Sequence, residues 1–157
     1  MTIYTALPIP SATLEELRTS DDAGRPPAPF TDEEGGAPLR CCLRRSEPGE
    51  HIALVSYAPL RRWAAETGAD PGAYDEQGPV FIHAGDCPGP SGAGLPFTGA
   101  HRTLRRYSAD GRILGGRLVE RDFPSALAEA FADPEVALVH VRAVEYGCFL
   151  YEVRRRG

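Results

Sequence analysis

The chain has 157 residues and a formal net charge of −5 at neutral pH, and all 17 of its basic side chains are arginine because it contains no lysine. This length suits one domain spanning residues 1–157. The negative charge argues against a general nucleic-acid-binding protein, and no apolar run is long enough to cross a membrane. The first ten residues lack the basic and apolar regions of a signal peptide, so we expect a cytoplasmic protein.

Glycine and proline are abundant, at 17 and 15 residues, which predicts a compact domain with many irregular loops. The four cysteines are too few for a disulfide scaffold. In the cytoplasm they would be thiols, metal ligands or small core residues. The absence of both lysine and asparagine is explained by the codon bias of a GC-rich genome, so the number of arginines is not by itself evidence of anion binding.

The first quarter of the chain predicts a strand, a helix and a loop. Residues 2–7 suit a short edge strand. The capping pattern from Thr13 to Glu16 predicts a helix that ends near residues 20–24. Residues 24–38 are rich in glycine and proline, which is typical of a solvated loop.

A hairpin is predicted next, because residues 39–46 and 51–58 flank the turn sequence Glu-Pro-Gly-Glu at 47–50. This pairing places Leu43 opposite Leu54 on an apolar face. The opposite face carries Arg40, Cys42, Arg44 and His51.

The middle of the chain predicts two helical turns over residues 60–67 and a short apolar strand over residues 79–84. Residues 85–99 form a second long loop rich in glycine and proline. Its glycine density resembles that of a phosphate-binding loop, but it lacks the lysine and the strand-to-helix context of one.

The last third predicts two hairpins with a helix between them. Asp110-Gly111 is a strong hairpin signal between residues 101–109 and 112–122, and residues 123–132 suit a helix that packs across the sheet. In the final hairpin, over residues 136–155, a loop with an odd number of residues gives one wholly apolar face. That register pairs Val139 with Val153, Val141 with Tyr151 and Ala143 with Phe149, and on the other face Leu138 with Arg154, His140 with Glu152, Arg142 with Leu150 and Val144 with Cys148.

The order of these elements predicts an α+β domain. Three hairpins and short connections favour a largely antiparallel sheet with extra strands and with two or three short helices packed on one face. The strands and helices do not alternate regularly, which argues against a doubly wound parallel sheet.

Several ordered segments resemble a known family. They are Pro-Leu-Arg-Cys-Cys-Leu-Arg at 38–44, Gly-Pro-Val-Phe-Ile-His at 78–83 with Cys87, Asp133-Pro-Glu-Val136, and His140-Val-Arg142 before Gly147-Cys148. Over about residues 30–155 the chain resembles a bacterial family known only as domain of unknown function 1203. The resemblance implies no activity, substrate or cofactor, and the chain departs from it at Leu39, where some relatives carry cysteine.

The cysteines and histidines offer two kinds of chemistry. His83 and Cys87 have a spacing that two zinc ligands use, and Cys42, Cys148 or His140 would be further ligands. Alternatively, the His83 imidazole would activate the Cys87 thiol as a nucleophile. The simpler interpretation is that Cys42 and Cys148 are small buried residues and that His83 caps a strand end, so we predict neither a metal nor any other cofactor.

An anion site is the third possibility. The predicted registers place Arg40 and Arg44 on the polar face of one hairpin and His140, Arg142 and Arg154 on the polar face of another. Guanidinium groups bind carboxylate or phosphate through two parallel hydrogen bonds. The simpler alternative is a solvated sheet face with pairs such as His140 and Glu152.

Three classes of function therefore stay open. We favour a module that binds a small molecule or anion on the arginine and histidine face. The alternatives are an enzyme built on His83 and Cys87, with or without a metal, and a non-catalytic domain that forms homo-oligomers through its sheet edges.

Overall fold

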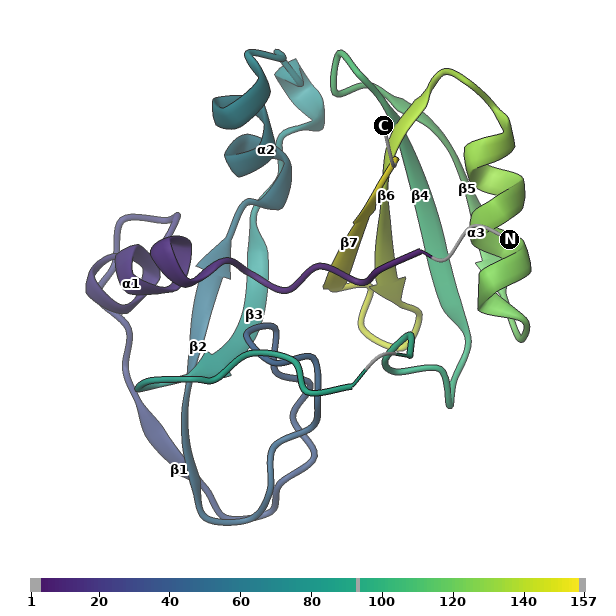
Figure 1. Cartoon of the computed structure of the whole chain (residues 1–157). Coiled ribbons are helices and arrows are strands. Elements are labelled where there is room, and N and C mark those ends of the chain that lie inside the picture. The colour runs from purple at the N-terminus through teal and green to yellow at the C-terminus, as the bar shows by residue number, and fades with distance from the viewer. Residues whose placement is uncertain (1–3, 93, 156–157) are drawn as a thin grey trace.

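A computed structural model describes residues 4–92 and 94–155. Its strands form two antiparallel sheets, one with the order β1-β2-β3 and one with the order β5-β4-β6-β7 (Figure 1). The strands are β1 (Phe30–Asp32), β2 (Glu50–Tyr57), β3 (Gly78–His83), β4 (Arg102–Ser108), β5 (Ile113–Val119), β6 (Val136–Ala143) and β7 (Phe149–Arg154). The predicted α+β class with antiparallel strands is confirmed, and the strands divide between two sheets.

The helices are α1 (Ser11–Thr19), α2 (Pro59–Thr67) and α3 (Phe123–Ala132), with a short 3₁₀ helix η1 (Gly72–Tyr74). All three α-helices were predicted. The start of α1 differs from the prediction, because its N-cap is Pro10 and makes no side-chain cap hydrogen bond. Among the described residues, no helix has the length and apolar content needed to cross a bilayer.

The four-stranded sheet contains the two hairpins that the sequence predicts. β4 and β5 join through a turn in which the Gly111 amide donates to the Ser108 carbonyl at 2.9 Å, with Gly111 at φ 85°. Helix α3 then packs on one face of this sheet. The core between them is entirely apolar and includes Leu127, Val139 and Val153, all fully buried.

The register between β6 and β7 is as predicted from Leu138 opposite Arg154 to Val141 opposite Tyr151. A bulge then shifts it, so that Arg142 lies opposite Phe149 instead of the predicted Leu150. One extra residue turns the following side chains to the other face. Phe149 therefore contacts the His140 ring, at 5.0 Å between centroids, and Leu150 joins the core under α3.

The second face of this sheet turns toward the three-stranded sheet (Figure 1). The expectation of a solvated polar face is wrong here, because His140 is 1% exposed and Glu152 is 8% exposed. Tyr107 covers His140 on one side, and Leu60 and Trp63 of α2 pack nearby against Tyr107 and Leu138. The helices thus lie on both sides of the four-stranded sheet.

The three-stranded sheet differs most from the prediction, since residues 39–46 do not pair with β2. β2 instead lies between β3 and β1, and β1 falls within the segment predicted as a loop. Phe30 is the partner of Ile52, and Leu54 is the partner of Phe81. β1 pairs with the beginning of β2 on one edge, β3 pairs with the other edge, and Leu39 bridges to Phe81 of β3 instead of joining β2.

The segment before α1 links the two sheets. Of the predicted edge strand 2–7, residues 2 and 3 lie outside the described part of the chain, and Leu7 makes an isolated bridge to Glu152 of β7. Tyr4 stacks on Phe131 of α3, and the Ile9 amide donates to the Arg40 carbonyl at 3.0 Å. This segment therefore runs from α3 across β7 to α1 (Figure 1).

Candidate metal centre

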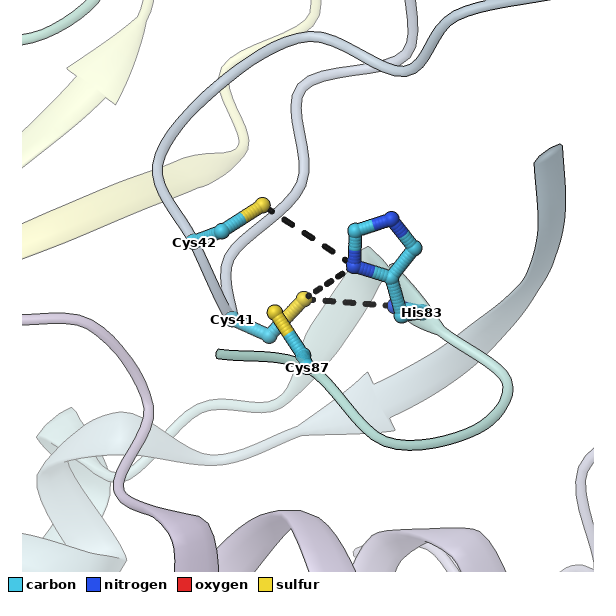
Figure 2. A group of neighbouring side chains, drawn as sticks. All are labelled: Cys41, Cys42, His83 and Cys87. Carbon is cyan, nitrogen blue, oxygen red and sulfur yellow. Dashed lines mark hydrogen bonds between the residues drawn. The ribbon is translucent and has the colours of Figure 1, made fainter. Parts of the chain in front are cut away.

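Four side chains with metal-ligating atoms meet beside the end of β3. They are Cys41, Cys42, His83 and Cys87, and one ligand atom from each lies within 4.8 Å of all the others (Figure 2). Cys41 and Cys42 are buried, at 2% and 6% exposed, and 12% of the His83 side chain is exposed.

Cys41 and Cys42 sit in a tight loop over residues 38–45. The Leu39 amide donates to the Arg44 carbonyl and the Leu43 amide to the Leu39 carbonyl, both at 2.9 Å. Leu43 has φ 57°, a left-handed conformation that ends any extended strand. In an extended strand neighbouring side chains point to opposite faces, whereas this turn lets two adjacent cysteines approach one histidine.

The loop is docked on β3, which brings it to His83. The Arg40 amide donates to the Phe81 carbonyl at 2.9 Å, and Leu39 forms a parallel bridge with Phe81. His83 is the last residue of β3, and Arg18 of α1 donates to its carbonyl at 3.2 Å. The chain then turns back, so that Cys87 reaches the same point from the following loop (Figure 2).

The ligand atoms converge on Nδ1 of the histidine. His83 Nδ1 lies 3.3 Å from Cys41 Sγ and 3.9 Å from Cys42 Sγ. The His83 amide also donates to Cys41 Sγ at 3.3 Å. The Cys41 thiol lowers the pKa of Cys42 to about 6 by hydrogen bonding to its thiolate, and the same interaction, with burial, raises the pKa of Cys41. One member of the pair is thus ready to act as a thiolate ligand near neutral pH.

The other nitrogen of the imidazole is held by a carboxylate. His83 Nε2 hydrogen-bonds to Glu50 at the start of β2. Arg44 binds both oxygens of that carboxylate, at 2.7 and 3.1 Å, and this lowers the pKa of Glu50 to about 2. A histidine that ligates a metal through one nitrogen usually donates to a carboxylate through the other. Glu50 therefore stands where a carboxylate would orient His83 toward a metal.

The four residues do not line either of two cavities in the described part of the chain, one between the sheets and one beside the segment 7–10. A nucleophilic thiol needs a cleft in which its substrate can bind. Four converging protein ligands are instead typical of a structural metal site.

The structure brings together three of the ligands considered in the sequence, Cys42, His83 and Cys87. Cys148 and His140 lie elsewhere: Cys148 accepts a hydrogen bond from Arg40 at 3.2 Å, and His140 pairs with Glu152 at 3.0 Å. Cys41 is the fourth member, and the sequence analysis missed it. The clue to Cys41 in the sequence was its position next to Cys42. Because residues 39–46 were predicted to form a strand, the two side chains were expected on opposite faces.

The five residues proposed for an anion site do not converge. Arg40 and Arg142 line the same cavity between the sheets. Arg44 belongs to the Glu50 and His83 network, and His140 is fully enclosed with its pKa lowered by burial. Arg154 lines the other cavity and pairs with Glu66 and Glu152.

Comparison with known proteins places the chain in a family. The family described as a protein of unknown function (DUF1203) matches residues 36–155, which is most of the chain, and the chain belongs to this family. No curated protein and no solved structure matches it.

Proposed function

We propose that this member of the DUF1203 family is a zinc-binding protein whose Cys41, Cys42, His83 and Cys87 hold one Zn²⁺ ion. The observation that carries this proposal is the convergence of four ligand atoms within 4.8 Å of one another. This proposal keeps Cys42, His83 and Cys87 from the metal alternative of the sequence analysis and takes Cys41 in place of Cys148 and His140.

The spacing of the ligands supports a tetrahedral ion. With Zn–S bonds of about 2.3 Å and Zn–N bonds of about 2.0 Å, a sulfur and a nitrogen on one zinc are about 3.6 Å apart. The two distances from His83 Nδ1 to the sulfurs of Cys41 and Cys42 are 3.3 and 3.9 Å. These values bracket the expected separation, so small side-chain rotations suffice to bind the ion.

The ligand set favours zinc over other metals. Three thiolates and one imidazole are soft ligands, and a tetrahedral site of sulfur and nitrogen is typical of Zn²⁺. Magnesium and calcium prefer oxygen ligands, and the one carboxylate nearby, Glu50, is bound to Arg44 and to His83 Nε2. Iron–sulfur clusters usually need four cysteines, whereas three are present here.

The role of such an ion is structural. Four protein ligands leave no position for a reacting water molecule. The ion would join the loop 38–45, the end of β3 and the loop after it, which also meet in one apolar cluster through Leu39, Ile82 and Cys87. It would thus fix the conformation of the loop that carries Arg40 into the space between the sheets.

Metal analysis of the purified protein tests this proposal. We expect about one zinc per chain after expression in zinc-containing medium and removal of free metal. Cys42→Ser, Cys87→Ser and His83→Gln should each lower this content strongly, whereas Cys148→Ser should retain it, because Cys148 is the one cysteine outside the cluster. Circular dichroism of each variant checks that it is folded.

Titration of the metal-free protein with Co²⁺ gives a second measurement. A tetrahedral site with three thiolates should produce strong visible bands and a sulfur-to-cobalt charge-transfer band, saturating at one equivalent. Absence of stoichiometric zinc or cobalt binding by the wild-type protein would overturn the proposal. Rapid alkylation of Cys87 that depends on His83 and is unaffected by zinc would favour the thiol nucleophile instead.

A further inference from the structure

A second site is suggested by the cavity between the two sheets. Its volume is about 650 Å³, within the range of pockets that hold small organic ligands. Its walls are largely apolar, with Tyr57, Val80 and Phe81 from the three-stranded sheet and Phe149 and Leu150 from β7. None of the four proposed zinc ligands lines these walls, although Arg40 comes from the same loop as Cys41 and Cys42.

The first polar feature of the cavity is a buried guanidinium group. Arg40 is 1% exposed. Its Nε donates to the Phe149 carbonyl at 2.8 Å, its Nη1 donates to the Pro38 carbonyl, and its Nη2 lies 3.2 Å from Cys148 Sγ. None of these partners is a carboxylate. Buried charges are normally paired with an opposite charge, because removing an ion from water is costly.

A second guanidinium group lines the same cavity. Arg142 donates through Nε to the carbonyl of Gly147, the residue before Cys148, at 3.0 Å. Its Nη1 lies 3.0 Å from Glu76, but that half-exposed carboxylate also binds Arg105. One negative charge is thus shared by two arginines, which leaves part of the Arg142 charge unbalanced.

The ionised side chains of the whole cavity have an excess of positive charge. Four arginines line it, and the two carboxylates are Glu76 and Glu145. Glu145 pairs with Arg102 at 3.1 Å. Arg45 donates to the Gly36 carbonyl and has no carboxylate partner among the described residues. The apolar walls and the unbalanced arginines together define the chemistry of a ligand.

We propose that the cavity binds a small organic carboxylate, with the carboxylate held by Arg40 or Arg142 and the apolar body against Tyr57, Phe81 and Phe149. Guanidinium groups present parallel donors that match a carboxylate, and they carry their charge at all physiological pH values. The apolar walls favour a hydrocarbon or aromatic body over a sugar or a nucleotide.

Two matched pairs of probes test the proposal on the protein as purified. Octanoate is compared with 1-octanol, and 3-phenylpropionate with 3-phenylpropanol, by isothermal titration calorimetry and ligand-observed NMR. We expect the carboxylate of each pair to bind at least about tenfold more tightly than its alcohol, because only the carboxylate balances the arginines. Inorganic phosphate should bind far more weakly, because it has no apolar body.

Variants locate the binding. Arg142→Gln should weaken carboxylate binding about 10–100-fold, the usual effect of losing a hydrogen bond to a charged group, and should not affect the alcohols. Arg117→Gln, an exposed arginine on β5 outside the cavity, should leave both unchanged. Tyr57→Leu tests the apolar wall without altering a charge, and it should weaken 3-phenylpropionate more than octanoate.

Three results would overturn the proposal. The first is that neither carboxylate binds when it is present at millimolar concentration and in roughly 10-fold excess over the protein. A millimolar dissociation constant is roughly the weakest affinity that the method detects. The second is equal binding of carboxylates and alcohols. The third is binding that survives Arg142→Gln unchanged. Zinc content, measured on the same samples, separates a failure of this site from a failure of the metal centre.

Discussion

The two sheets are stabilised in different ways. The four-stranded sheet is covered by α3, and the space between them is filled by apolar side chains such as Leu127, Val139 and Val141. The three-stranded sheet carries the long segment 33–49, which combines buried apolar side chains such as Leu39 and Leu43 with several polar contacts. Asp32 accepts from the Gly35 amide at 3.0 Å, and Ser46 Oγ accepts from the Ala37 amide at 2.9 Å.

On the zinc proposal, the metal centre would add to the stability of the second region. Ordering an irregular loop costs conformational entropy, and the burial of Leu39 and Leu43 offsets part of that cost. Ligation of zinc by Cys41, Cys42, His83 and Cys87 would offset more of it. The two regions should therefore respond differently to loss of metal and to loss of core volume.

Removal of zinc has the largest expected effect. Apparent binding free energies for structural zinc are roughly 10–16 kcal/mol at neutral pH, so chelation should open the cluster. Hydrogen exchange followed by mass spectrometry should show faster exchange in residues 37–46 and at the end of β3, with little change in β6 and β7. Uniform acceleration throughout the chain would show that the two regions do not differ in this way.

Leu127→Ala tests the opposite region. Leu127 is fully buried in the core between α3 and the four-stranded sheet, so we expect the free energy of unfolding to fall by about 2–5 kcal/mol. Leu118→Ala is the matched control, since Leu118 on β5 is 54% exposed and its truncation should have little effect. Zinc content should be the same in both variants. Loss of zinc in Leu127→Ala would mean that the two regions unfold as one.

The pair of His140 and Glu152, which is buried between the sheets, makes the free energy of unfolding depend on pH. Burial lowers the pKa of His140, partly offset by Glu152, while Arg142 and Arg105 lower it further. The unfolded chain then binds more protons than the folded one as pH falls through the ordinary histidine pKa of about 6.5, so stability decreases there. Denaturation at pH 7.5 and 5.5 should show a smaller decrease for His140→Gln than for the wild type.

The control for this substitution is His51→Gln, at an exposed position on β2 away from the pair. The comparison between variants removes contributions from other titrating groups, including those of the metal centre. An unchanged or steeper pH dependence in His140→Gln would contradict the assignment.

The smallest expected effect is at the surface. Arg117 of β5 pairs with Glu129 of α3, and their side chains are 56% and 65% exposed. Exposed ion pairs contribute roughly 0–1 kcal/mol, so Arg117→Ala should lower the free energy of unfolding by about 0.5 kcal/mol or less. A larger loss, measured by chemical denaturation, would mean that α3 depends on this pair as well as on its apolar face.

The same contrast governs what the sequence predicts about the fold. In the four-stranded sheet the two hairpins pair segments that are close in sequence, so the Asp110-Gly111 turn and the alternation along residues 136–155 were sufficient signals for them. In the three-stranded sheet, β1 pairs with β2 across a long intervening segment. No local pattern distinguishes Phe30 from residues 39–46 as the partner of β2.

The metal centre was only partly predictable. His83 and Cys87 are close in sequence, and Cys42 was considered with them. Cys41 was not, because a strand puts adjacent residues on opposite faces, whereas the left-handed Leu43 closes a turn in this loop. Glu50 was also missed, since its contact with His83 depends on β2 and β3 being neighbours.

The sequence by itself therefore determined the α+β class, the helices and the two C-terminal hairpins, since each depends on interactions between residues close along the chain. The tertiary structure decided which residues share a site. Cys41 and Cys42 meet His83 because the loop 38–45 docks on β3, and Arg40 and Arg142 line one cavity because two sheets enclose it. Such contacts join distant segments, and their free energy comes from packing and desolvation that only the assembled fold provides.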